Sequence, residues 1–308
     1  MHVYGSFNFF VEGNIASNDY AINLPVNHPD WAEVLYSPES HGQCRSVLEL
    51  DKGSMLCYVN PANEDVCSFE LERVREVLDN YEIDGIIMDR TRYDNQYADF
   101  SDISRARFER YLAQKGKRLE HWPEDVYTFE QEKNMVWGPL YKEWLAFRSN
   151  MVREFAAKLR KVVEEYQKQQ NRNIVLAAYV GAWYDLYYQN GVNWASEDFV
   201  YQEMLKFPVP ELYTEEYAQT SYLKYIDFLM IGCYYDQVSM IEKYVTIGNI
   251  VTNQKVPVIA SLSLPHLDSE KKLCSATEAC VELSDGVMFF DLCYTLWEKL
   301  SEALKCVR

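Results

Sequence analysis

The run IDGIIMD (residues 83–89) is short and apolar, and it ends on an acidic residue, Asp89. A run of this kind predicts a buried β-strand. Five other runs share the pattern: HVYGSFNFF (2–10), NIVLAAYV (173–180), DFLMIGCYY (227–235), VPVIASLSL (256–264) and GVMFFDLCY (286–294). Amphipathic stretches separate the six runs, so we predict parallel strands joined by crossover helices.

Helix signals lie between the predicted strands. The first clear helix follows NPAN (60–63), with Asn63 as its N-cap and two acidic residues in its first turn. A long helix is predicted from about Pro139 to Lys168, because apolar residues recur there every three or four positions. Further helices are predicted after Asp102 and over roughly 237–249, 269–283 and 296–306.

A small hairpin is also expected outside this repeating pattern. The runs CRSVLEL (44–50) and SMLCYVN (54–60) are both β-prone, and a turn-forming Asp51-Lys52-Gly53 separates them. We therefore predict that these two runs pair with each other.

Alternating strands and helices fit two architectures, a closed barrel and an open doubly wound sheet. The open sheet usually carries a Gly-rich turn after a strand, and none of the six runs is followed by GxGxxG or GxxxxGK(S/T). Polar and aromatic residues gather instead at the strand carboxyl ends, where a (β/α)₈ TIM barrel builds its site. We predict an α/β barrel, although closure needs eight strands and six are visible.

Composition narrows the ligands of the chain. Its 308 residues carry 30 Lys+Arg and 47 Asp+Glu, a formal net charge of -17, which would repel nucleic acid and anionic lipid. Aromatic residues make up 15% of the chain, and Tyr and Trp suit clefts that bind neutral ligands with polar and apolar faces. A sugar is such a ligand, so we expect a carbohydrate partner, no nucleic acid and no membrane.

Several other chemistries lack their sequence signals. The five histidines form no HxH or HExxH motif, and no GxSxG elbow is present, so we expect no metal or other cofactor and no serine hydrolase. The N-terminus shows no basic flank followed by an apolar signal core. The eight cysteines form no CxxC pair, which favours free buried thiols, with one disulfide as the alternative.

The segment DGIIMDRTRYDNQYADFS (84–101) resembles the glycosyl-hydrolase-like TIM barrels known as alpha-amylase family proteins of gut bacteria. The resemblance continues through GSFNFFVEG (5–13), YVNPANEDV (58–66), WPEDVY (122–127), YVGAWYDLYYQNGVNWAS (179–196), GCYY (232–235) and SDGVMFFDLCY (284–294). It therefore covers nearly the whole chain in order.

The resemblance implies that GSFN (5–8) lies on the third barrel strand. Residues 1–308 would then form a single TIM-barrel domain that lacks its first two βα units. Two open strand edges and an exposed apolar interior would follow, so we expect either a partner in the gap, for instance a second copy, or a poorly soluble protein. Relatives look secreted or periplasmic, although this chain shows no signal.

Asp89 is the best candidate for catalysis. Glycoside hydrolysis normally uses two carboxyl groups, and Asp89 ends an apolar strand beside Arg90 and Arg92, either of which could keep it ionised. Its Gly-x-x-x-Asp spacing resembles the nucleophile strand of alpha-amylases, but Ile87 stands where those enzymes carry an arginine. The competing interpretation is a structural ion pair between Asp89 and one of the two arginines.

The second carboxyl is harder to choose. Asp291 ends the last strand and ranks first, Asp185 ranks second and Asp236 third, because the region after NIVLAAYV offers no Glu of the kind that alpha-amylases use as the acid. That none of the three is a general acid is an equally open alternative.

Sugar-binding candidates surround these carboxyls. Side chains that could donate hydrogen bonds or stack on a sugar ring are Asn8, Arg90, Arg92, Tyr93, Tyr179, Trp183, Tyr184, Tyr234 and Asp236. Of these, Trp183 and Tyr234 are the strongest expectations for ligand-facing aromatic rings.

Three functions remain open from the sequence. The leading one is a glycoside hydrolase that cleaves an oligo- or polysaccharide with Asp89 in the mechanism. The second is a non-catalytic carbohydrate-binding barrel, favoured by the missing Glu. The third is an interaction protein whose aromatic residues form an oligomer interface.

Overall fold

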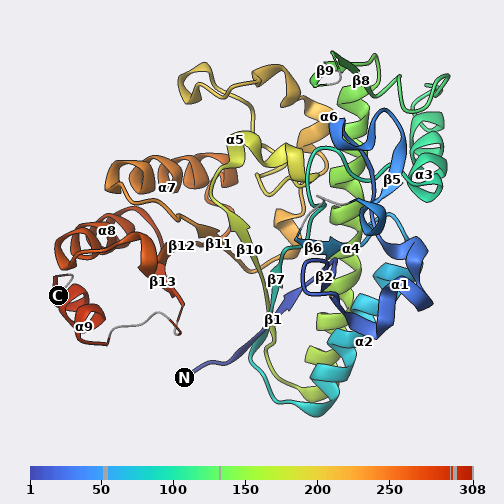
Figure 1. Ribbon diagram of the computed structural model, residues 1–308. Coiled ribbons are helices and arrows are strands. Elements are labelled where there is room, and N and C mark those ends of the chain that lie inside the picture. The colour runs from blue at the N-terminus through green and yellow to red at the C-terminus, as the bar shows by residue number, and fades with distance from the viewer. Residues whose placement is uncertain (51–54, 132, 292, 294–296, 307–308) are drawn as a thin grey trace.

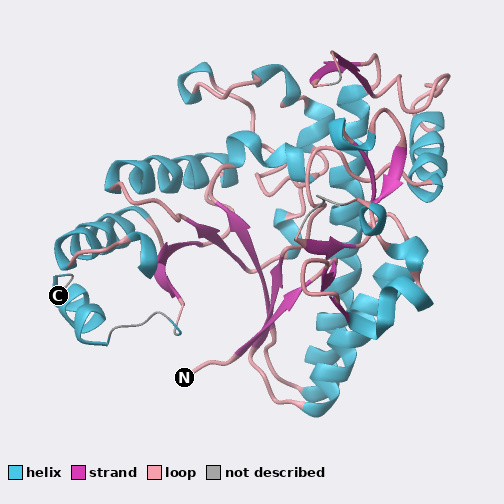
Figure 2. Cartoon of the chain, viewed as in Figure 1, coloured by secondary structure: helices cyan, strands magenta, loops and turns pink. Residues whose placement is uncertain are grey.

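A computed structural model describes residues 1–50, 55–131, 133–291, 293 and 297–306. Its central element is a six-stranded parallel sheet with the order β1-β7-β10-β11-β12-β13, and the sheet curls into a half-barrel with helices on its outer side (Figures 1 and 2). All six predicted strands are confirmed as sheet members: β1 (Tyr4–Asn8), β7 (Gly85–Asp89), β10 (Val175–Gly181), β11 (Phe228–Gly232), β12 (Val258–Ser263) and β13 (Gly286–Phe290).

The predicted helices are confirmed with small shifts of their ends. Asn63 caps the first of them, since its side-chain oxygen accepts a hydrogen bond from the Asp65 N–H at 2.9 Å. The longer helices are α2 (Glu64–Asn80), α3 (Asp102–Ala113), α4 (Tyr141–Gln170), α7 (Val238–Thr252), α8 (Glu270–Leu283) and α9 (Trp297–Cys306), and the short ones are α1 (Leu24–Asn27), α5 (Tyr184–Tyr187) and α6 (Glu215–Ala218). Among the described residues, no helix is both long and apolar enough to cross a bilayer.

The predicted hairpin is wrong. The strand β5 (Cys44–Ser46) pairs with β4 (Val34–Tyr36), and β6 (Leu56–Tyr58) pairs with β2 (Val11–Asn14), which also carries β3 (Asp19–Tyr20). The expected turn, Asp51-Lys52-Gly53, lies outside the described residues. Both runs pair with strands that precede them in the chain. A turn signal between two runs gives no information about such earlier partners. One further hairpin joins β8 (Tyr127–Glu130) and β9 (Asn134–Trp137).

The sheet is part of a (β/α) barrel and not a complete one. The strands β1 and β13 form its two ends, and each pairs with a single neighbour in the six-stranded sheet. In-register partners share a face, so Tyr4, Ile87 and Phe228 belong to the inner, concave side, where they are only half-buried. Alternate residues such as Phe7 and Met88 are buried against the helices.

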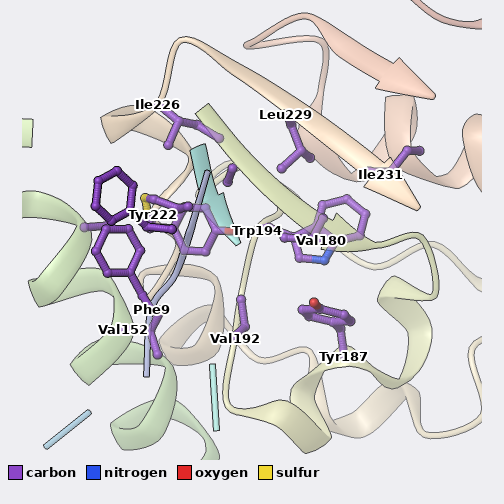
Figure 3. Packing of buried hydrophobic residues seen from close by; sticks show 14 of the residues in the cluster. Phe9, Val152, Val180, Tyr187, Val192, Trp194, Tyr222, Ile226, Leu229 and Ile231 are labelled. Atoms are coloured by element: carbon purple, nitrogen blue, oxygen red, sulfur yellow. The ribbon is translucent and has the colours of Figure 1, made fainter. Parts of the chain in front are cut away.

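The helix α4 joins two hydrophobic clusters. Its second half packs Val152, Phe155 and Leu159 into the main core under the sheet, where the Phe155 ring lies 5.0 Å from that of Phe9. Figure 3 shows Val152 and Phe9 in this core. Its first half contributes Trp144 and Phe147 to an aromatic cluster built from the segment after β7. A helix of 30 residues is about 45 Å long, enough to serve both.

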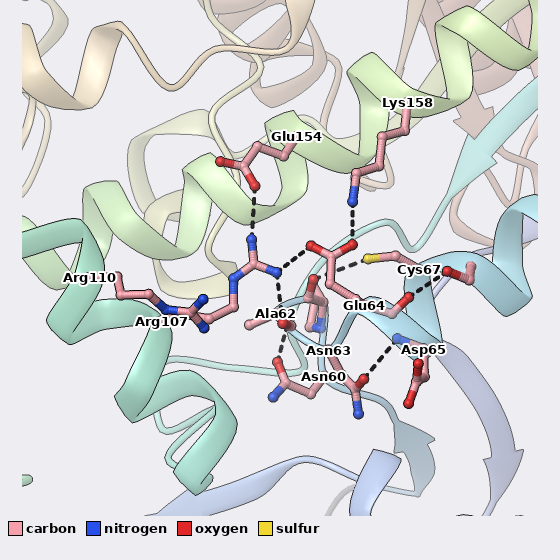
Figure 4. A network of polar contacts seen from close by, with 12 residues as sticks. Asn60, Ala62, Asn63, Glu64, Asp65, Cys67, Arg107, Arg110, Glu154 and Lys158 are labelled. Atoms are coloured by element: carbon pink, nitrogen blue, oxygen red, sulfur yellow. Dashed lines mark hydrogen bonds and ion pairs between the residues drawn. The ribbon is translucent and has the colours of Figure 1, made fainter. Parts of the chain in front are cut away.

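A polar network fastens α2 and α3 to α4. The Glu64 carboxylate accepts hydrogen bonds from Arg107 at 2.5 Å and from Lys158 at 2.5 Å, while Arg107 also reaches Glu154 at 3.0 Å (Figure 4). Three helices thus share one set of charges, although their partial exposure keeps each pair weak.

The buried Asp99 orders the loop before α3 but does not cap the helix. Ser101 is the N-cap and accepts from the Ser104 N–H at 3.2 Å, whereas Asp99 accepts from Asn60 at 2.7 Å and from the Val34 N–H at 2.6 Å. Asp99 therefore acts on the loop and not on the helix terminus.

One disulfide is present, which was the less favoured alternative for the cysteines. Cys274 on α8 is bonded to Cys306 at the end of α9. The free thiols among the described residues are those of Cys44, Cys57, Cys67, Cys233, Cys280 and Cys293, and four of these six are buried.

Two carboxyl groups lie buried together at the base of β2. Glu12 and Glu70 both contact Arg73, and Glu70 also accepts a hydrogen bond from the Phe10 N–H at 3.1 Å. Burial and the neighbouring Glu12 raise the pKa of Glu70 from 4.5 to about 8. The folded protein therefore holds a proton here that the unfolded chain releases at a lower pH.

We expect the free energy of unfolding to fall as the pH rises from 4.5 to about 8, because over this range the unfolded chain binds fewer protons than the folded one. The slope attributable to Glu70 is up to about 1.4 kcal/mol per pH unit. Glu70→Gln, which cannot ionise, should flatten this slope in urea unfolding measured at several pH values. Glu76→Gln, an exposed change on the same helix, is the control. If the unfolding free energy had the same pH slope in the wild type and in Glu70→Gln, the raised pKa of Glu70 would be contradicted.

Candidate functional site

The site begins with a row of in-register residues at the carboxyl ends of three strands. Asn8 on β1 pairs with Asp89 on β7, and Asp89 pairs with Tyr179 on β10. Parallel pairing points their side chains to the same face of the sheet, which is the concave one. The strand pattern that places Asp89 last in its run therefore also places it at the mouth of the half-barrel.

Asp89 sits in a partly buried, charged environment. One of its carboxylate oxygens accepts the N–H of Arg90 at 2.8 Å. Burial raises the pKa of Asp89 above its ordinary value, while the nearby guanidinium groups of Arg90 and Arg92 oppose this rise. The carboxyl therefore keeps its proton up to a higher pH than an exposed Asp would.

A cavity of about 250 Å³ opens over Asp89. Its walls come from the ends of β7, β10, β11 and β13 and from the segments that follow the first three of these strands. The lining residues are Asp89, Arg90, Arg92, Tyr179, Val180, Gly181, Trp183, Tyr187, Gly232, Tyr234 and Phe290. Five predicted site residues outside the carboxyl pair are thus brought together with Asp89: Arg90, Arg92, Tyr179, Trp183 and Tyr234.

Hydroxyl groups gather on one wall of this cavity. The Tyr179 hydroxyl contacts the hydroxyl of Tyr234 and lies 2.7 Å from the Ser261 hydroxyl. The Tyr234 ring stacks on Phe290 at 5.4 Å and faces His266 at 6.4 Å. Burial raises the pKa of both tyrosines, so their hydroxyls stay protonated and can donate hydrogen bonds.

Three residues of this wall were not predicted from the sequence: Ser261, Phe290 and His266. A signal for Ser261 existed, because Ser261 and Ser263 alternate with Ala260 and Leu262 in a buried strand and so share its other face. His266 follows that strand within a short 3₁₀ turn and bonds the Ser263 hydroxyl at 2.7 Å. No sequence motif marks it.

Trp183 forms the opposite, aromatic wall. Its indole ring lies directly over Gly181, at a place where any Cβ on residue 181 would collide with the ring. The side chain is 40% exposed, as an aromatic platform for a ligand must be. Its ring also packs at 5.7 Å from Tyr187, which is buried and fixes the position of the platform.

The two loops that carry Arg92 and Trp183 are tied to each other. The buried guanidinium of Arg148 on α4 donates to the carbonyls of Asn95 and Gln189, one in each loop, and lies 4.6 Å from the Tyr93 ring. Tyr93 also donates its N–H to the Asn190 carbonyl at 3.0 Å. Tyr93 is therefore a core residue beneath the site, which corrects its prediction as a sugar-binding one.

Gly191 is required at this junction. Its φ is +63°, and a Cβ there would lie 2.5 Å from the Tyr93 ring. Both the left-handed backbone and the close approach exclude larger residues.

Tyr184 and Asp185 lie away from the cavity. Tyr184 is buried and donates its hydroxyl to Asn193 at 3.0 Å, so its predicted contact with a ligand is also corrected. Asp185 faces α7, where one oxygen lies 3.5 Å from the Tyr244 hydroxyl and the other is buried with no hydrogen-bond partner. Both residues lie on α5, a short helical turn whose Tyr184 and Asp185 side chains are buried outside the cavity.

The remaining candidates stand at the edge of the site. Asp236 is exposed, as is Asn8, and neither lines the cavity. Asp291 directly follows the lining residue Phe290 and accepts the Cys293 N–H at 2.8 Å. Burial is the main cause of the raised pKa of Tyr234, and the charges of Asp89 and Asp291 add to the rise, so both carboxyls lie near that hydroxyl.

This geometry offers one carboxylate inside the cavity, a second beside it, two guanidinium groups and two tyrosine hydroxyls. Such a set can bind polar groups and transfer a proton. Within the described part of the chain, no group of three or more His, Cys, Asp or Glu is placed to hold a metal ion.

A larger cavity, of about 450 Å³, lies between α2 and α3 on the helical side. Its Arg107 and Glu64 are already paired with each other (Figure 4). It is therefore a weaker candidate than the strand-end cavity.

Comparison with known proteins supports the fold more than any activity. No family model matches the chain. The chain is 38% identical over 305 residues to an S-layer-related protein of Niallia circulans, a match that covers 99% of this chain and 19% of that protein. The chain thus spans about a fifth of the length of that relative.

Solved structures give a second comparison. The glycoside hydrolase domain of PgaB (BpsB) from Bordetella bronchiseptica aligns with a TM-score of 0.56 and 12% identity, over 83% of this chain and 65% of that one. The fold is therefore like that of a glycoside hydrolase. A GH36 alpha-galactosidase, AgaA from Geobacillus stearothermophilus, covers all of this chain and 30% of its own at a TM-score of 0.41 and 12% identity, which is too low to carry an argument.

The aromatic platform yields a test of the site itself. We expect Trp183→Ala to weaken polysaccharide binding about tenfold in affinity electrophoresis, because a stacking surface is lost. Trp137→Ala is a matched control, since Trp137 is also 40% exposed but lies on the β8–β9 hairpin. Equal losses in the two variants would exclude Trp183 as the platform.

Proposed function

We propose that the chain is a glycoside hydrolase that cleaves O-glycosidic bonds of an oligo- or polysaccharide. The observation that carries the proposal is the cavity at the strand carboxyl ends, in which Asp89 lies between guanidinium groups and aromatic walls. The glycoside-hydrolase-like fold supports it, because barrels of this kind place their active sites at that end.

In the proposed mechanism, Asp89 is the ionised carboxylate that faces the anomeric carbon. Arg90 and Arg92 favour its charged form and so oppose the effect of burial. Asp291 is the proposed acid, which gives its proton to the leaving glycosidic oxygen. Tyr179 and Tyr234 line the same cavity as Asp89, and their hydroxyls would hold sugar hydroxyls by hydrogen bonds.

We also propose that the chain is related to the alpha-amylases. A relation to alpha-amylases rests on the spacing from Gly85 to Asp89, and Ile87 departs from their pattern. The name of the Niallia circulans relative supports a place for the chain in a larger protein of the cell surface, where extracellular polysaccharide is within reach.

A non-catalytic carbohydrate-binding barrel is the second candidate. A specific observation favours it: Asp89 is the one carboxylate among the residues that line the cavity. Both candidate functions predict that the cavity binds a carbohydrate, but only the glycoside hydrolase predicts that the carbohydrate is cleaved.

We further propose that residues 1–308 form one barrel domain whose sheet is completed by strands from elsewhere, for instance from a second copy. Support comes from the two sheet ends, β1 and β13, and from the half-buried apolar residues of the concave face.

The open sheet predicts a pattern of hydrogen exchange. Backbone amides of β1 that point away from β7 should exchange faster than those of the central β7, and sedimentation equilibrium should show self-association that rises with concentration. A monomer in which β1 is as protected as β7 would contradict the proposal of open edges.

Replacement of the central carboxyl tests the hydrolase. On aryl glycosides and on plant and host glycans, we expect Asp89→Asn to lower the rate by roughly 10²–10⁴-fold. The wild-type rate should also fall at low pH, as Asp89 is protonated at a pH above that of an ordinary Asp.

Asp30→Asn is the matched control, because it makes the same change at an exposed position outside the cavity. Equal rates for Asp89→Asn and the wild type would remove Asp89 from the mechanism. Binding without turnover on every glycan would select the carbohydrate-binding alternative.

A further inference from the structure

The cavity over Asp89 has a charge opposite to that of the chain. The whole sequence has 30 Lys+Arg against 47 Asp+Glu, yet the cavity lining holds Arg90 and Arg92 against a single carboxylate. An acidic protein that gathers positive charge at this strand-end cavity creates a local attraction for anions.

The guanidinium groups of Arg90 and Arg92 remain able to bind a negatively charged ligand. Within the described residues, neither Arg90 nor Arg92 forms an ion pair with a carboxylate. They affect the pKa of Asp89, but one positive charge would balance its single negative one.

Arg92 is held in place while part of its guanidinium stays uncommitted. One of its nitrogens donates to the carbonyls of Tyr93 and Asp94, at 3.0 and 2.8 Å, and the group lies 5.1 Å from the Tyr58 ring. An arginine fixed in this way loses little conformational freedom when its remaining N–H groups bind a ligand.

Arg90 is the more adaptable of the two. Its side chain is exposed, and its backbone has a φ of +49°, which turns the chain sharply just after Asp89. The turn sets its side chain at the mouth, beside the carboxylate that would face the scissile bond.

Guanidinium groups recognise planar carboxylates and tetrahedral oxyanions through paired hydrogen bonds, and neutral sugar hydroxyls do not need two of them. We propose that the sugar bound in this cavity carries an anionic group, a uronate carboxylate or a sulfate ester, which Arg90 and Arg92 bind. This inference rests on the proposed function and names its substrate class.

The experiment uses two matched pairs of polymers, polygalacturonate with its methyl ester and dextran sulfate with dextran. Isothermal titration calorimetry of the wild type should show about tenfold tighter binding to the acidic member of at least one pair. The pair that responds distinguishes a carboxylate from a sulfate.

The variants assign that preference to the cavity. Arg90→Gln should remove the preference for the acidic polymer, so that the variant binds the acidic and the neutral member of a pair with equal affinity. Arg110→Gln, at an exposed arginine on α3 outside this cavity, should keep the preference and so exclude a general effect of charge.

Three outcomes would overturn the inference: equal or tighter binding of the neutral polymers, failure of both acidic polymers to bind, or equal loss of both kinds of binding in Arg90→Gln. Turnover of neutral glycans that depends on Asp89 would leave the proposed hydrolase standing while the anionic substrate fails. A hydrolase that fails shows no such turnover on any glycan.

Discussion

The site depends on one buried arginine. Arg148 reaches from α4 to a carbonyl in the loop after β7 and to another in the loop after β10, and its guanidinium packs on Tyr93 between them. Two of its nitrogens are buried without a hydrogen-bond partner, and burial lowers its pKa. Burial of a charged group costs free energy, and here the buried guanidinium holds the two loops in a fixed relative position. The same two loops carry Arg92 and Trp183 of the cavity walls.

The strands and helices could be predicted from the sequence because their signals are local. The apolar residues of IDGIIMD and of its five counterparts indicate by themselves that these runs are buried. Asn63 likewise caps the helix that begins at the next residue. The position of Asp89 at the mouth followed directly from its place at the end of a strand. The parallel order of the strands then required only that the helices cross over between them.

The errors arose where distant segments decide the environment. Tyr93 and Tyr184 follow strand ends, as ligand-binding aromatics do, but α4 and the segment after β10 bury them. The strand β5 pairs with β4 and not with its neighbour in sequence. The hydroxyl cluster combines Tyr179 on β10, Tyr234 after β11 and Ser261 on β12, which are brought together by the pairing of these three strands in the sheet.

The length of α4 has a consequence for how the protein is built. One helix supplies side chains to the main core and to the aromatic cluster of the segment after β7, so neither cluster has a complete surface without it. The segment after β7 is thus no detachable module, despite its separate cluster. The two clusters should melt in a single cooperative transition, so the cavity mouth should lose its geometry together with the half-barrel.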